Sequence, residues 1–116
     1  MKRSIEKLAL GAAAVMLAAF LMVGAGRAQD AVTVNITLKD HRFQPSEPHA
    51  PAGKPINIVL KNLDAAPAEF ESNMLRVEKV VTGGGSIIMR IRPLEPGRYR
   101  FFDDFHQETQ GYLVVQ

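Results

Sequence analysis

The sequence predicts an all-β fold, a sandwich of two sheets built from roughly seven short strands. Several runs alternate apolar and polar residues, and clusters of Pro, Gly, Asn and Asp separate these runs. No stretch after the first 28 residues shows a convincing long helical pattern. Since neither an internal repeat nor a low-complexity linker interrupts the pattern, one domain accounts for it.

The first 28 residues have the three-part pattern of a secretory signal peptide. Lys2, Arg3 and Lys7 precede an apolar run over residues 8–23, and small residues up to Ala28 complete the pattern. We therefore expect a signal peptide over 1–28 and a mature, soluble periplasmic domain over 29–116. The apolar run is short for a spanning helix, so an uncleaved membrane anchor is the less favoured alternative.

Charge and cysteine content exclude several functions. Four of the 14 Lys and Arg and one of the 12 Asp and Glu lie in the leader, which leaves ten positive and eleven negative side chains. The mature chain keeps no basic cluster that would bind a phosphate backbone, so we do not expect it to bind nucleic acid. Absence of cysteine from the sequence excludes a thiolate nucleophile, an iron–sulfur cluster and a cysteine zinc site.

The strand patterns follow one another along the chain. The clearest is at residues 32–38, where apolar residues at even positions alternate with polar ones. In residues 68–71, Phe70 takes one face, and Glu69 and Glu71 share the other. Residues 73–81 fit a helical stripe as well as a strand, and we interpret them as a strand. The remaining strand patterns cover residues 56–60, 87–91, 99–102 and 112–115.

The candidate functional site is the polar stretch between the last two predicted strands. It contains Asp103, Asp104, His106 and Glu108, so carboxylates and an imidazole would gather at the end of a strand pair. Such donors suit Cu(II), iron and Mn(II), whereas a soft Cu(I) site would favour sulfur. Crowded carboxylates raise one another's pKa, and a bound cation relieves that cost. The stretch therefore predicts a metal site.

Each candidate also has an ordinary structural interpretation. Asp103 and Asp104 could cap turn amides, and for Asp104 we favour that role. Without its three-residue spacing from Asp103, His106 would be interpreted as a surface histidine. Glu69 could belong to the solvated face of a strand, although we slightly favour a role in the site. His41 could approach the same rim from the end of the first strand.

Several motifs resemble the cupredoxins over essentially the whole mature chain. They are Phe43-Gln-Pro45, Ala52-Gly53, a strand ending in Asn62, and Leu94-Glu-Pro-Gly97-Arg-Tyr99. The resemblance implies a cupredoxin-like Greek-key β-sandwich with a metal-binding loop after the penultimate strand.

The resemblance also places residues by position. Asp103 stands where copper-binding members have a cysteine, His106 at the second histidine, and Gln110 near the axial methionine. Glu69 or Glu71 takes the place of the upstream histidine. Without a thiolate the site is not a blue-copper centre, which disfavours a simple electron shuttle.

The Pro67-Ala-Glu-Phe-Glu71 pattern, with a final loop that lacks a thiolate, is similar to cupredoxin domains of the EfeO type. This resemblance implies a small periplasmic protein of a bacterial ferrous-iron uptake system. It would work beside a periplasmic iron-binding protein and a membrane iron permease. The implied metal ligands are Asp103, His106 and Glu69, with Glu71 and His41 as weaker candidates.

Two functions follow as expectations. In the first, copper and/or iron binds at a carboxylate and histidine site, and Fe(II) is oxidised with copper as the electron acceptor, a ferroxidase-like activity. In the second, the domain is a metal-free adapter that docks on the iron carrier or a membrane subunit through Asp104, Phe105 and Glu108.

Overall fold

The structure is a computed structural model that describes residues 30–116, so the predicted signal peptide lies outside the described residues. Between residues 30 and 116 it contains nine strands, and none of these residues forms a helix that could cross a membrane. In chain order the strands are β1 (Val32–Lys39), β2 (Arg42–Gln44), β3 (His49–Ala50), β4 (Ile56–Asn62), β5 (Ala68–Ser72), β6 (Val77–Val81), β7 (Ser86–Ile91), β8 (Gly97–Asp103) and β9 (His106–Val115).

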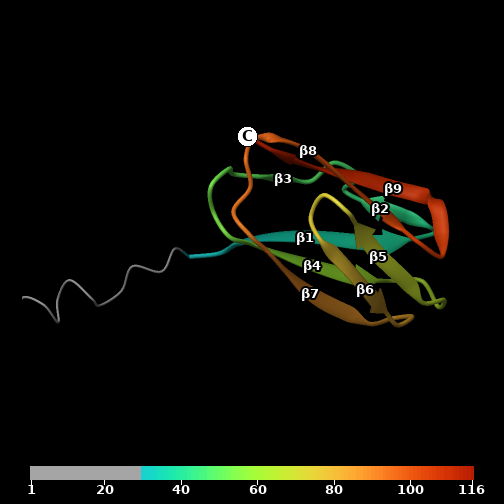
Figure 1. The fold of residues 1–116 in the computed structure, drawn as a ribbon. Helices are drawn as coiled ribbons and strands as arrows, with labels where there is room; N and C mark the ends of the chain where they lie inside the picture. Colours follow the sequence, from blue (N-terminus) through green and yellow to red (C-terminus); the bar gives the residue numbers. More distant parts are fainter. Residues whose placement is uncertain (1–29) are drawn as a thin grey trace, which may run out of the picture.

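The strands form two facing sheets (Figure 1). One has four strands in the order β2-β1-β4-β7, and the other has five in the order β3-β9-β8-β5-β6. β1 is parallel to β4 and β3 is parallel to β9, while the other pairs are antiparallel. Because the chain changes sheet five times along its length, each sheet contains strands from distant parts of the sequence. The predicted all-β sandwich is confirmed.

One apolar core lies between the layers. The period-two pattern of β1 places Ile36 and Leu38, each 1% exposed, on its inner face. Phe43, Phe70 and Phe101 form an aromatic cluster in which the Phe101 ring centroid lies 5.0 Å from each of the other two. Burying a side chain of this kind stabilises the fold by about 1.5–3 kcal/mol relative to exposure.

Two connections contain strands that the sequence did not predict, and one predicted strand is shorter than expected. The break after the first strand contains β2, and the irregular stretch at residues 48–55 contains β3. The ambiguous segment 73–81 divides into a turn and β6, so the strand interpretation is confirmed for 77–81 and wrong for 73–76. β2 and β3 are too short to show a pattern of their own and depend on pairing with β1 and β9.

The last hairpin is tighter than predicted. β8 ends at Asp103 and β9 begins at His106, so the turn has only two residues. The expectation of a long polar loop is wrong, because the residues after His106 belong to β9. Asp103 pairs with His106 and Phe102 pairs with Gln110, which leaves residues 107–109 without partners on β8. This bulge explains why a strand contains polar residues that interrupt the alternating pattern.

Candidate metal centre

His41 lies in the connection between β1 and β2, at the end of the sandwich that also contains the β8–β9 turn (Figure 1). The φ angles of Asp40 and His41 are 51° and 56°. The Asp64 carboxylate accepts a hydrogen bond from each backbone amide, at 2.7 Å from Asp40 and 3.0 Å from His41. These bonds lower the pKa of Asp64, the His41 amide most, because they stabilise the ionised carboxylate.

Asp103 is a buried carboxylate, 1% exposed, at the end of β8. Its Oδ1 accepts hydrogen bonds from the backbone amides of Glu69 and Phe105, both at 3.0 Å. Its Oδ2 lies 3.3 Å from Nδ1 of His106. Since both oxygens have protein partners, Asp103 holds the imidazole of His106 from behind.

The rings of His41 and His106 lie side by side, with centroids 4.3 Å apart and planes inclined by 46°. His41 is exposed, and the side chain of His106 is 37% exposed. Because Nδ1 of His106 faces Asp103, Nε2 is the nitrogen left to face a ligand. Two adjacent imidazoles offer nitrogen donors of the kind that copper, zinc, nickel and iron accept.

Three carboxylates form a second donor group on the outer face of the five-stranded sheet. Glu69 and Glu71 are alternate, half-buried residues of β5, and Asp104 follows β8. One oxygen from each lies within 4.8 Å of the others, and residues 30–116 contain no other such group of three His, Asp or Glu side chains. Carboxylate oxygens at this spacing suit hard cations.

Crowding makes the charged form of these carboxylates costly. The pKa values of Glu69 and Glu71 are raised above the ordinary value, and partial desolvation is the largest cause for both. For Glu69 the next causes are a hydrogen bond with Glu78 and repulsion from it. For Glu71 the next cause is repulsion from Asp104. A bound cation would remove part of this cost.

The five predicted site residues divide between two faces of the molecule. Asp103, His106 and His41 lie together at the tip, whereas Glu69 and Glu71 lie on the outer face of the sheet. The two groups are adjacent because the Glu69 amide donates to Asp103. That these residues bind a metal stays a prediction.

Sequence reasoning missed Asp64, which holds the His41 connection. A local signal existed, since Asp64 follows Asn62, and the Asp64 amide donates to Asn62 Oδ1 at 3.0 Å in a turn of the kind that Asn favours. The hydrogen bond that the His41 amide donates to Asp64 spans 23 residues of sequence, and no local pattern indicates such a contact. Asp104 was interpreted as a turn residue, and the structure adds it to the carboxylate group.

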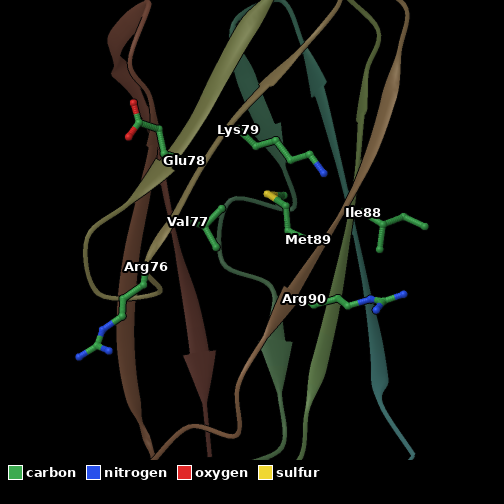
Figure 2. A pocket seen from close by; sticks show the side chains of 7 residues that line it. All are labelled: Arg76, Val77, Glu78, Lys79, Ile88, Met89 and Arg90. Carbon is green, nitrogen blue, oxygen red and sulfur yellow. The ribbon is translucent and has the colours of Figure 1, made fainter.

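Two hollows in the surface are compared with the donor groups. One hollow of about 550 Å³ lies between the edge strands β6 and β7. Val77 and Met89 point into this gap, while Ile88 points away (Figure 2). A smaller hollow of about 250 Å³ next to His41 is lined mainly by β2 and by the bulged part of β9. Neither hollow brings three metal donors together.

Comparison with known proteins gives the family. The sequence matches the cupredoxin-like domain over residues 11–115. The chain belongs to the cupredoxin-like family. This cupredoxin-like chain is also similar to an uncharacterized protein of Rickettsia prowazekii, strain Madrid E, with 38% identity over 104 residues that cover 88% of this chain and 83% of the relative.

Solved structures share the fold at low sequence identity. The metal binding domain of the Cu(I) exporting P-type ATPase CopA of Streptococcus pneumoniae D39, with Cu(I), has a TM-score of 0.65 at 15% identity over 76% of this chain and 97% of that domain. Auracyanin A, a blue copper protein from Chloroflexus aurantiacus, has a TM-score of 0.61 at 15% identity over 75% of this chain and 100% of that chain. The purple cupredoxin of Nitrosopumilus maritimus has a TM-score of 0.56 at 18% identity over 75% of this chain and 100% of that chain. The predicted resemblance to cupredoxins is confirmed, and these likenesses concern the fold.

Proposed function

We propose that this cupredoxin-like chain is a periplasmic metal-binding protein with two adjacent donor groups. Copper binds the imidazoles of His41 and His106, and Fe(II) is a substrate that approaches the carboxylates of Glu69, Glu71 and Asp104. The observation that carries the proposal is the contact of the two imidazoles in front of the buried Asp103 carboxylate. The Cu(I) domain and the blue copper protein among the structural neighbours support copper as the metal.

The donors fit a copper ion that has no sulfur ligand. The sequence contains no cysteine, and both Asp103 oxygens already accept or share protein hydrogen bonds. A carboxylate behind a ligating histidine fixes the orientation of the ring and raises the basicity of its other nitrogen. Nε2 of His106 and a ring nitrogen of His41 would hold the ion. Among divalent first-row metals, Cu(II) generally binds such donors most tightly.

The carboxylate group gives the substrate side of the proposal. Oxygen ligands favour Fe(III) over Fe(II), so Fe(II) held by Glu69, Glu71 and Asp104 loses an electron more readily. When bound, copper would supply the electron acceptor, with one Cu(II) reduced to Cu(I) for each Fe(II) oxidised to Fe(III). The residues that join the two groups are Glu69, through its amide, and Asp103, which contacts His106.

The place of this chemistry in the cell rests on sequence resemblance. The chain resembles cupredoxin domains of the EfeO type and, among them, FtrB of bacterial ferrous-iron uptake systems. We assign it to such a system, where it would assist the oxidation of Fe(II) and its transfer to a membrane iron permease with a periplasmic iron-binding protein. The predicted signal peptide over residues 1–28 supports export to the periplasm.

Metal analysis of the protein recovered from the periplasm tests this proposal. We expect about one equivalent of copper per chain in the parent, because imidazole nitrogens bind copper tightly. The pair His41→Ala and His106→Ala should lose it. The pair Glu69→Gln and Glu71→Gln should keep copper and oxidise added Fe(II) more slowly. A parent protein that holds no copper and leaves Fe(II) oxidation at the rate of buffer contradicts the proposal.

A second candidate function is the metal-free adapter. Phe105 is 48% exposed in the β8–β9 turn, next to Asp104, and Leu63 is 47% exposed in the β4–β5 connection. Exposed apolar side chains beside carboxylates suit a protein partner with a basic rim. If this function holds, Phe105→Ser should weaken copurification with the periplasmic iron-binding protein, and the purified parent should contain no metal.

A further inference from the structure

We infer that Asp64 is the positioning residue of the histidine pair: it fixes the β1–β2 connection so that the imidazole of His41 lies against that of His106. The effect of Asp64 on metal affinity rests on the proposed function. Its effect on the geometry of the two rings concerns the protein without metal and is tested separately.

The backbone of the β1–β2 connection explains why such a residue is needed. Asp40 and His41 are consecutive residues with positive φ, a backbone conformation that residues other than glycine seldom adopt. This conformation persists only where the surroundings stabilise it. The two oxygens of the Asp64 carboxylate accept one amide hydrogen bond each, so a single side chain holds both strained residues.

The other side of the His41 peptide is held as well. Thr109, which is 3% exposed, donates a hydrogen bond from Oγ1 to the carbonyl of His41 at 2.7 Å. This threonine lies in the bulge of β9, only three residues from His106. Asp64 and Thr109 therefore hold the amide and the carbonyl of the same residue. The His41 ring starts from a fixed backbone position, which brings it to within 4.3 Å of the His106 ring centroid.

Asp64 itself is anchored to a buried side chain. Asn62, fully buried at the end of β4, accepts a hydrogen bond from the Asp64 amide at 3.0 Å. Its Nδ2 donates to the carbonyl of Ala66 at 2.8 Å and to that of Thr82 at 3.2 Å. A chain of hydrogen bonds thus links the buried Asn62 through Asp64 to the backbone of His41.

The experiment measures Cu(II) affinity and ring proximity in the full chain. Asp64→Ala removes both amide acceptors, and Asp64→Asn keeps one acceptor oxygen. Glu95→Ala, which removes an exposed carboxylate from the β7–β8 connection, is the matched control. We expect Asp64→Ala to weaken Cu(II) binding by about tenfold, the effect typical of residues that orient metal ligands, with a smaller loss for Asp64→Asn and none for Glu95→Ala.

A double-mutant cycle separates positioning from general destabilisation. If Asp64 acts through His41, Asp64→Ala causes no further loss of Cu(II) affinity in the His41→Ala background. An equal loss in both backgrounds overturns the inference. If Asp64→Ala does not fold, the same cycle with Asp64→Asn decides the question.

Nuclear magnetic resonance of the metal-free protein gives the geometric readout. We expect nuclear Overhauser contacts between the His41 and His106 rings in the parent and in Glu95→Ala, and their loss in Asp64→Ala. Contacts that persist in Asp64→Ala overturn the inference. A parent that shows the contacts but binds no Cu(II) contradicts the proposed function instead.

Discussion

The backbone amide of Glu69 donates a hydrogen bond to Oδ1 of Asp103 at 3.0 Å, and this bond joins the two donor groups of the molecule. The side chain of Glu69 points to the outer face of its sheet, and the side chain of Asp103 is buried against His106. The Asp104 amide also donates to the Glu69 carbonyl at 2.9 Å. The carboxylates and the imidazoles are therefore separate groups that share one piece of backbone.

Asp103 should matter more for stability than any other carboxylate at the tip. Asp103→Ala leaves the amides of Glu69 and Phe105 without their acceptor in a buried place, and each orphaned donor costs about 1–3 kcal/mol. We expect the free energy of unfolding, measured with urea, to fall by about 2–4 kcal/mol. Asp103→Asn keeps an acceptor oxygen and should lose less.

Asp104→Ala is the matched control for that measurement, because Asp104 follows Asp103 directly and its Oδ1 accepts only from the exposed Gln107 side chain. Its effect on stability should stay within about 0.5 kcal/mol, as for most surface substitutions. An Asp103→Ala protein as stable as Asp104→Ala would contradict the buried hydrogen bonds.

The two histidines should contribute separately to copper binding. His41→Ala and His106→Ala should each weaken Cu(II) binding by about tenfold or more, because each removes one of two nitrogen donors. The ring of His41 is exposed, so its replacement should change the unfolding midpoint little. His106→Ala also removes the partner of the buried Asp103 Oδ2 and should lower the midpoint. Isothermal titration of the parent and of each variant with Cu(II) measures the effect.

His49→Ala is the control for the copper titration. His49 is exposed in β3, and its ring contacts Gln116, which follows the end of β9 opposite to His106. Copper affinity should not change in this variant. If all three histidine variants bind copper like the parent, the ion binds elsewhere.

The sequence was sufficient for the longer strands and insufficient for features that depend on pairing across a sheet. Alternation identified β1, β4 and β5, because their inner faces are apolar and their outer faces polar. It could not identify the bulge at residues 107–109, since a bulge is defined by pairing with another strand. The polar stretch between the last two predicted strands was therefore interpreted as a loop.

The same limit applies to the candidate site. The three-residue spacing of Asp103 and His106 favoured His106 as a metal ligand, which stays a prediction. The structure brings the two side chains to 3.3 Å, a contact that is local in sequence. The position of Glu69 relative to Asp103 depends on the pairing of Phe70 with Asp103, which brings together residues more than thirty positions apart. Since Phe70 points into the core, Glu69 points outward, away from the histidines.

The raised pKa values on β5 predict a pH-dependent cost in stability. A carboxyl whose pKa is higher in the folded than in the unfolded state destabilises the fold once the pH rises above its ordinary value, 4.5 for glutamate. Glu71→Gln should therefore raise the melting temperature at neutral pH, and the gain should vanish as the pH falls below that value. Added salt should reduce it, because the repulsion from Asp104 is screened.

The pKa of Asp64 is shifted in the opposite direction from that of Glu71, so its effect on stability has the opposite sign. Its pKa is lowered in the folded state, so its contribution to stability is present above its ordinary value of 3.8 and is lost as the pH falls through the folded-state value. Asp64→Asn should thus be less stable than the parent at neutral pH and similar to it in strong acid. Melting curves in which Glu71→Gln and Asp64→Asn respond to pH in the same direction would contradict these assignments.

Gly111 in β9 should be hard to replace, because two neighbours occupy the space of a side chain. A Cβ at this position would lie 2.5 Å from the carbonyl oxygen of Ser46 and 2.6 Å from the ring of Phe101. The Ser46 carbonyl accepts the Tyr112 amide at 2.9 Å, and Phe101 is fully buried, so neither can move away freely. Gly111→Ala should lower the free energy of unfolding by about 1–3 kcal/mol through overpacking. Gly97→Ala is the control, since its nearest side-chain atom would lie at an ordinary 3.6 Å, and equal urea midpoints for the two variants would contradict the packing of residue 46 on β9.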